Sequence, residues 1–239
     1  NQKGGVGKTT TSVNLAASLS TMRRRVLLID LDPQGNATMG SGVSKDELVE
    51  SIYDVLVYQE SITDIARKNH DTGFFLLGSN SDLTAAEIEL LAMENRESRL
   101  KNALIGLESD YDYVFIDCPP SLNLLTLNAL VAAQGVIIPM QCEYYALEGL
   151  TALMGTVTRV REQLNSSLKI EGIVRTMYDP RNSLTKDVSA QLSEYFGDRL
   201  YRTVVPRNVR LAEAPSYGLP VYYYDSKSSG SKAYLALAG

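Results

Sequence analysis

Short, mainly apolar runs recur along the chain, each four to eight residues long, with longer stretches of mixed polarity between them. Runs of this length that lack strict alternation are typical of strands buried on both faces of a parallel sheet. They cover residues 26–31, 74–77, 113–116, 136–140, 170–177 and 200–205. We therefore expect these segments to form the strands of one buried, mainly parallel sheet.

Between these runs, apolar residues recur three and four positions apart, which predicts helices with one buried face. The expected helices cover residues 9–22, 83–107, 122–133, 147–164 and 184–196. Strands that alternate with helices imply crossover units, so we expect an α/β fold with a doubly wound, mainly parallel sheet flanked by helices. Because no linker, internal repeat or low-complexity tract interrupts the pattern, we expect a single domain over residues 1–239.

Both ends of the pattern are unusual. A glycine-rich loop of the kind found at residues 3–10 normally follows a strand, and no strand-length apolar segment precedes Asn1. We therefore expect that the first strand is missing from this sequence, and residues 233–239 read as the start of a helix that is cut short. Before them, residues 222–224 are three tyrosines that follow Pro220, a composition that favours an edge strand.

The composition favours a protein without a membrane anchor. The 239 residues are 44% hydrophobic but include no apolar run of about 18 residues and no signal-peptide pattern, so we expect a cytoplasmic location. The two cysteines lie 24 positions apart, which argues against a disulfide framework or a zinc site. The net charge is −5, yet residues 159–210 hold ten Lys or Arg against six Asp or Glu. This local excess suits either a nucleic-acid patch or an ordinary solvated face.

Residues 3–10 read K-G-G-V-G-K-T-T, which predicts a phosphate-binding loop that runs into a helix. Lys8 is placed to reach the β- and γ-phosphates of a nucleotide, and the Thr9 hydroxyl to join the shell of Mg²⁺. The loop is a variant, because Gln2 stands where the usual pattern has glycine and Lys3 adds a second lysine. The predicted phosphate contacts are Lys3, Gly4, Gly5, Val6, Gly7, Lys8, Thr9 and Thr10.

Two aspartates follow apolar runs at positions where an open α/β sheet places its ligand. Asp117 ends the run 113–116 and suits Mg²⁺ binding, directly or through water. Asp32 ends the run 26–31 and precedes P-Q-G-N. Asp30 lies on the same face as Asp32 and has two open interpretations, a hydrogen bond in the outer shell of the metal or a purely structural role.

Five motifs, in this order, resemble those of the ParA-type partition ATPases, and of their short chromosomal branch, the Soj proteins. The motifs are the loop at 3–10, V-L-L-I-D-L-D-P-Q-G-N at 26–36, Y-V-F-I-D-C-P-P-S at 113–121, Q-C-E-Y-Y-A-L-E-G at 141–149 and P-R-N-V-R-L-A-E-A-P-S at 206–216. The resemblance spans nearly the whole chain. It implies the P-loop NTPase fold in its deviant Walker A branch, with ATP and Mg²⁺ as cofactors.

The resemblance also implies the roles of the catalytic residues. Lys3 is expected to reach across a nucleotide-sandwich homodimer to the phosphates of the partner subunit, while Gly4 allows the close approach of the two subunits. Asp32 is expected to position or activate the attacking water, and the expected catalytic set is Lys3, Lys8 and Asp32. The expected magnesium set is Thr9, Asp32 and Asp117.

Later segments are expected to contact the base and DNA. The resemblance points to Thr176, Met177, Pro206 and Asn208 for the base, although Asn208 is equally suited to cap a helix. It points to Arg181 and Arg210 for non-specific binding to double-stranded DNA, where either arginine could instead be an ordinary surface residue. Contacts of this kind go to phosphates and carry no base information.

The expected function is therefore a slow, partner-stimulated ATP hydrolase that serves as an ATP-gated dimerisation and DNA-binding switch in chromosome or plasmid partitioning. The implied partners are a second copy of the chain, DNA of the nucleoid and a ParB-type protein. Two alternatives stay open. One is a related ATPase that positions a protein cargo on the nucleoid, and the other is a regulatory module that only senses nucleotide.

Overall fold

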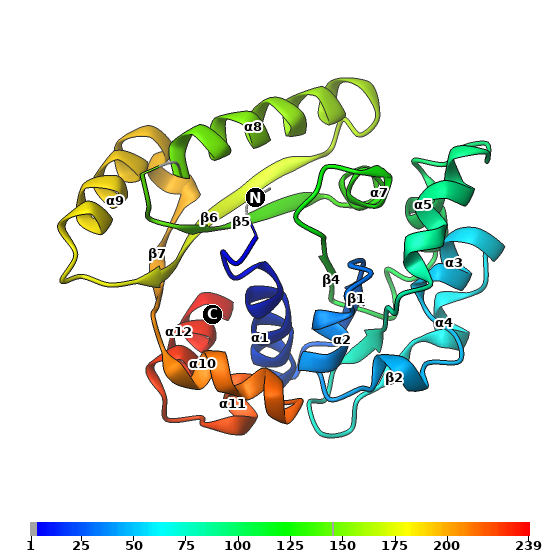
Figure 1. The fold of residues 1–239 in the computed structure, drawn as a ribbon, viewed down its shortest axis with the longest axis horizontal. Coiled ribbons are helices and arrows are strands. Elements are labelled where there is room, and N and C mark those ends of the chain that lie inside the picture. The colour runs from blue at the N-terminus through cyan, green and yellow to red at the C-terminus, as the bar shows by residue number, and fades with distance from the viewer. Residues whose placement is uncertain (1–3, 145) are drawn as a thin grey trace.

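The computed structural model describes residues 4–144 and 146–239, whose strands form two sheets (Figure 1). The first sheet has the order β2-β3-β1-β4 and the second the order β5-β6-β7, so the strands expected in one sheet are divided between two among the described residues. Every pairing is parallel except the antiparallel pair β2–β3. The strands are β1 (Val26–Asp30), β2 (Arg67–Lys68), β3 (Phe75–Leu77), β4 (Tyr113–Asp117), β5 (Gly135–Gln141), β6 (Lys169–Tyr178) and β7 (Leu200–Pro206).

Helices connect the strands and cover the sheets. The longer helices are α1 (Lys8–Thr21), α5 (Leu83–Leu91), α7 (Leu124–Ala132), α8 (Ala146–Gln163), α9 (Ser183–Phe196) and α12 (Ser229–Ala238). The shorter ones are α2 (Asn36–Gly40), α3 (Ile52–Tyr58), α4 (Ile62–Ile65), α6 (Arg99–Ala103), α10 (Val209–Glu213) and α11 (Val221–Tyr224), with 3-10 turns at Lys45–Glu47, Gly197–Arg199 and Ala214–Tyr217. This alternation confirms the doubly wound α/β fold.

β1 illustrates why its segment is apolar without interruption. Leu27 and Ile29 are buried in one core together with residues of α3, α5 and α6. Val26 and Leu28 point to the opposite face and are buried against α1. Since both faces are covered, the positions of this strand are apolar until its carboxyl end, where Asp30 is the first polar residue.

The second sheet is also covered on both faces. α8 and α9 pack on one side of it, and α10, α11 and α12 pack on the other, close to α1 (Figure 1). Neighbouring residues of β6 separate the two layers, because Ile173 belongs to the core under α8 and α9, and Val174 to the core under α12. α1 contacts β1 and β4 of the first sheet and β5 of the second, and it carries the loop that precedes it into the middle of the fold (Figure 1).

β4 and β5 are each paired along one side only within the described residues, to β1 and β6 respectively. Tyr113 and Val114 at the start of β4 are 44% and 38% exposed. The expectation that this strand is buried on both faces is therefore wrong for its first half. The second half, from Phe115 to Asp117, is progressively more buried toward the site.

Three local predictions are corrected. The helix expected over 83–107 is two helices, α5 and α6, because the chain turns through residues 92–98, where Asn95 has a left-handed backbone with φ 53°. The three tyrosines at 222–224 are helical in α11 and not an edge strand, with Pro220 as the N-cap and Tyr224 stacked on Tyr217 at 4.9 Å between ring centroids. The last helix begins at Ser229, earlier than expected. No helix in the described residues is long and apolar enough to cross a bilayer.

Candidate functional site

The glycine-rich loop leads directly into α1. Gly5 and Gly7 have left-handed φ values of 73° and 87°, and Gly7 is the N-cap of the helix. This cap has no side chain to accept hydrogen bonds from the first turn of α1. Because the first N–H groups of a helix have no partner within the helix, the start of α1, at the positive end of the helix dipole, is suited to bind an anion.

Asp117 is joined to the first turns of α1 by two hydroxyl groups. Thr9 Oγ1 donates to Asp117 Oδ2 at 2.7 Å, and Ser12 Oγ donates to Asp117 Oδ1 at 2.9 Å. Burial raises the pKa of Asp117 to about 6, although these two hydrogen bonds act in the opposite direction. The sequence analysis did not include Ser12, whose position one helical turn after Thr9 was the available signal.

Lys8 lies at the same place, at the first position of α1. Burial lowers the pKa of its ammonium group, and the nearby carboxylates of Asp117 and Asp32 oppose that shift. The lysine, the two aspartates and the Thr9 hydroxyl are thus gathered at the end of β1 and β4, as the sequence predicted.

This set of oxygen atoms suits Mg²⁺. Among the described residues, no group of three or more His, Cys, Asp or Glu side chains is arranged to hold a metal by itself. Mg²⁺ takes one or two carboxylates and completes its shell with water and substrate phosphates, so the Thr9 hydroxyl beside a buried Asp117 is a fitting donor set.

Asp32 follows β1 and is 8% exposed. Its Oδ1 accepts the N–H of Gln34 at 3.0 Å, and its main-chain oxygen accepts the N–H of Gly35 at 2.9 Å and the hydroxyl of Ser79 at 2.9 Å. In the described part of the chain, no group donates a hydrogen bond to Oδ2. Within the described residues, one carboxylate oxygen is therefore fixed by the turn, and the other is open to a ligand or water.

Asp30 is fully buried, and all its hydrogen bonds come from neighbouring protein groups. Thr38 donates both its N–H and its hydroxyl to Asp30 Oδ2, each at 2.8 Å, and the N–H of Asp32 donates to Oδ1 at 3.2 Å. Burial, followed by the charge of Asp117, raises the pKa of Asp30 to about 7. Of the two interpretations left open by the sequence, these contacts favour the structural one.

Of the residues expected to contact the base, Thr176 lies at the phosphate loop, whereas Asn208 caps a helix. The Thr176 hydroxyl donates to the main-chain oxygen of Val6 at 2.8 Å and so touches the phosphate loop. Met177 follows with a left-handed φ of 49°, and Pro206 ends β7. Asn208 caps α10, because its Oδ1 accepts the N–H of Leu211 at 3.2 Å.

The two arginines expected at DNA both form ion pairs. Arg181 is 89% exposed and pairs with Asp179 at 2.8 Å in the turn after β6. Arg210 on α10 pairs with Glu213 at 2.9 Å and with Asp225 at 3.3 Å. Each guanidinium is accessible, but a DNA phosphate must compete with a carboxylate for it. Lys3 lies outside the described residues.

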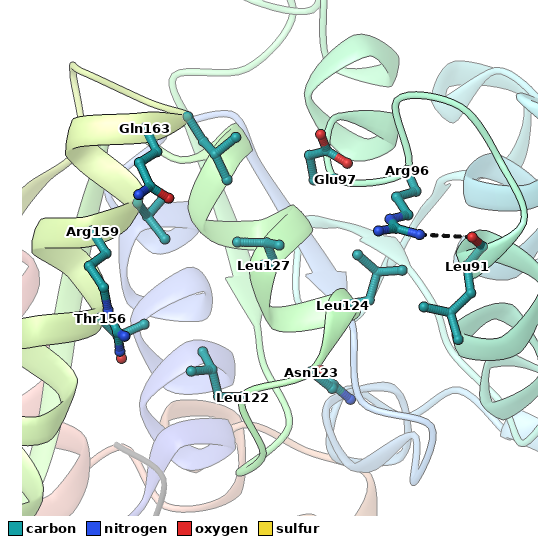
Figure 2. A pocket seen from close by; sticks show the side chains of 12 residues that line it. Leu91, Arg96, Glu97, Leu122, Asn123, Leu124, Leu127, Thr156, Arg159 and Gln163 are labelled. Carbon is teal, nitrogen blue, oxygen red and sulfur yellow. Dashed lines mark hydrogen bonds between the residues drawn. The ribbon is translucent and has the colours of Figure 1, made fainter.

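A separate pocket of about 650 Å³ lies over α7, between α8 and the loop that precedes α6. Figure 2 shows Leu122, Leu124 and Leu127 along its floor, with Arg159 of α8 on one side and Arg96 on the other. None of the residues predicted for the phosphate site lines this pocket. The site is therefore defined by the loop and its hydrogen bonds, and not by the cavity.

Comparison with known proteins identifies the family of this chain. Residues 1–170 match the family model described as an AAA domain (AAA_31). The chain is 52% identical over 238 residues to the sporulation initiation inhibitor protein Soj of Bacillus subtilis, covering 100% of this chain and 94% of that protein. It is 51% identical over 240 residues to the chromosome partitioning protein ParA of Caulobacter vibrioides, covering 100% and 90%.

Solved structures share the fold of this chain. A cobyrinic acid a,c-diamide synthase from Mycobacterium smegmatis, with bound ADP and magnesium, superposes with a TM-score of 0.86 at 39% identity, covering 100% of this chain and 89% of that one. A putative plasmid partition protein of Borrelia burgdorferi, bound to AMPPNP, gives 0.82 at 27% identity, covering 100% and 95%. Because the curated relatives Soj and ParA match over the whole of the chain at 51–52% identity, the chain belongs to the ParA/Soj family of chromosome-partitioning ATPases.

Proposed function

We propose that this chain is a Mg²⁺-dependent ATP hydrolase in which ATP closes a homodimer that binds double-stranded DNA without sequence preference. Hydrolysis is slow, is accelerated by a ParB-type partner, and resets the switch in the cytoplasm at the nucleoid. The observation that carries the proposal is the uncapped start of α1, coupled through the Thr9 hydroxyl to the buried Asp117.

Each group of the site has a part in this reaction. The N–H groups at the start of α1 bind the phosphate oxygens, and Lys8 neutralises their charge. Thr9 and Asp117 would hold Mg²⁺, which when bound would neutralise charge on the phosphates. The free oxygen of Asp32 accepts a hydrogen bond from the attacking water and orients it, since phosphoryl transfer depends on positioning more than on covalent help.

Dimer formation is assigned to Lys3, which binds phosphate held by the partner subunit. Loss of the γ-phosphate removes that contact, so hydrolysis loosens the dimer. The substitution Lys3→Ala should abolish ATP-dependent dimers in gel filtration, while nucleotide binding to the monomer changes little. Dimers that persist in the variant would show that Lys3 is not the bridge.

DNA binding is assigned to Arg181 and Arg210. The affinity for DNA falls as salt rises, and each phosphate contact that is lost should make the slope of log affinity against log salt less negative by about 0.9. Arg181→Ala and Arg210→Ala should therefore weaken binding equally for unrelated duplexes. Arg25→Ala is the matched control, because Arg25 is also exposed and paired, with Asp112 at 2.9 Å. An equal loss in the control, or a loss with one duplex only, contradicts the assignment.

The experiment that tests the whole switch is binding of the Asp32→Ala protein to a random DNA duplex, with ATP and with ADP. This variant is expected to keep only a small residual rate of hydrolysis, so the ATP state persists during the measurement. Binding with ATP alone is the expected result. Binding with neither nucleotide would exclude DNA from the mechanism. It would favour the two alternatives, an ATPase that positions a protein cargo or a module that senses nucleotide.

A further inference from the structure

The direction of the Asp32 carboxylate depends on the main chain around it. Its Oδ1 is bonded to the N–H of Gln34, two residues later. A carboxylate held in such a turn moves with the peptide units that form it, so whatever fixes the main chain at Asp32 also fixes the free oxygen.

Two hydrogen bonds from outside this turn hold the peptide units of Asp32. Asp30 Oδ1 accepts its N–H at 3.2 Å, and the hydroxyl of Ser79 donates to its main-chain oxygen at 2.9 Å. Ser79 is fully buried and comes from the segment after β3, 47 residues along the chain. The strand next to β1 is thus tied to the turn that carries Asp32.

Thr38 connects the two holding groups to each other. Its hydroxyl donates to Asp30 Oδ2 at 2.8 Å and accepts the N–H of Ser79 at 2.9 Å. Thr38 is fully buried on α2, and a Cβ on Gly78 would lie 3.2 Å from its methyl group, so the space around it is filled. The hydroxyl of Thr38 therefore completes a closed ring of hydrogen bonds that runs from Asp32 through Asp30, Thr38 and Ser79 back to Asp32.

We propose that Thr38 and Ser79 are positioning residues for ATP hydrolysis, which act by fixing the direction of the Asp32 carboxylate. This inference rests on the proposed function of Asp32. Neither residue belongs to the phosphate loop or to the Thr9–Asp117 contact. Loss of either hydroxyl should therefore slow the hydrolytic step and leave nucleotide affinity unchanged.

The first test compares Thr38→Val, which keeps the shape and loses the hydroxyl, with Thr38→Ser, which keeps the hydroxyl. For Thr38→Val we expect kcat to fall about tenfold, the loss produced by a small misplacement of a catalytic group. The KM for ATP and the Kd of a non-hydrolysable ATP analogue should stay within about twofold. Thr38→Ser should retain most of kcat. If Thr38→Ser loses as much as Thr38→Val, the methyl group matters and the proposal is wrong.

A double-mutant comparison separates positioning from general destabilisation. In the Asp32→Ala background, Thr38→Val and Ser79→Ala should cause no further loss of kcat, because the group that they position is absent. A loss as large as in the wild-type background would overturn the proposal. Ser79→Ala serves if Thr38→Val does not fold, as judged by thermal unfolding. If Asp32→Ala itself hydrolyses ATP normally, the assignment of Asp32 fails, which is a different outcome from failure of the ring.

Discussion

Gly35 provides a quantitative test of how closely the Asp32 turn is packed. It lies between Asp32 and α2, with a left-handed φ of 64°. A Cβ added there would lie 2.7 Å from the main-chain oxygen of Ser79 and 3.0 Å from Cδ of Lys45. The lysine side chain can move away, but Ser79 is fully buried and hydrogen-bonded, so its backbone cannot yield easily.

The cost of Gly35→Ala follows from these two features. A left-handed backbone costs an alanine about 1–2 kcal/mol. Forcing the Cβ against a fixed main-chain oxygen adds about 1–3 kcal/mol, the usual range for overpacking. We therefore expect the free energy of unfolding to fall by about 2–5 kcal/mol. For a chain of this size that lowers the melting temperature by about 5–15 °C.

Urea unfolding followed by circular dichroism measures this loss, and Gly106→Ala is the matched control. Gly106 also has a left-handed φ, of 91°, but no atom lies within 4 Å of its added Cβ. The control should lose only the backbone part, about 1–2 kcal/mol. If Gly35→Ala costs no more than Gly106→Ala, this turn does not approach Ser79 closely, and Ser79 does not hold the main chain of Asp32 in a hydrogen-bonded ring.

Three further predictions concern stability, alkaline pH and metal. Gly155→Ala in the exposed middle of α8, where no atom within 4 Å meets the added Cβ, should raise the free energy of unfolding by about 1 kcal/mol; a lower urea midpoint would contradict this. Burial raises the pKa of Tyr234 to about 12, so its contribution to stability is complete below its ordinary pKa of about 10 and is lost as pH rises toward 12. The free energy of unfolding, measured with urea between pH 9 and 11.5, should consequently decline less steeply with pH for Tyr234→Phe than for the wild type. Equal slopes in the two proteins would refute the raised pKa of Tyr234. Asp117→Asn should raise the Mg²⁺ concentration needed for half-maximal ATP hydrolysis about tenfold or more, and an unchanged Mg²⁺ titration would exclude Asp117 from the metal site.

The strands could be predicted from the sequence because strands buried on both faces consist almost entirely of apolar residues. β1 and β6 carry apolar residues on both faces, so a short apolar run is enough to locate them. α2, α4 and α11 have four or five residues each and are too short for a helical period to be visible. Tyr222 is helical despite the β-propensity of tyrosine, because Pro220 caps the helix and Val221 is buried there.

The site was predictable only where one motif contains both partners or where strand ends meet. Thr9 and Asp117 could be placed together because the loop and the end of β4 belong to the same edge of the sheet. The hydrogen bond between Ser79 and Thr38 joins residues 41 positions apart, and serine and threonine occur in any loop. Nothing in the local sequence distinguishes these two hydroxyls from solvated ones, so only the folded chain identifies them.

The hydrogen bond between Thr11 of α1 and Tyr234 of α12 joins residues 223 positions apart. α1 also packs directly against α12, so one side of the helix that carries the phosphate loop is covered by a segment made much later. At the usual rate of translation, about 10–45 s separate the synthesis of these two residues. During that interval the nascent chain has its phosphate loop but not the partner that buries the helix behind it. The helix that carries the phosphate loop therefore reaches its final packing only after a segment 223 positions later has been made, and a ribosome-bound chain is expected to bind nucleotide only after α12 has emerged.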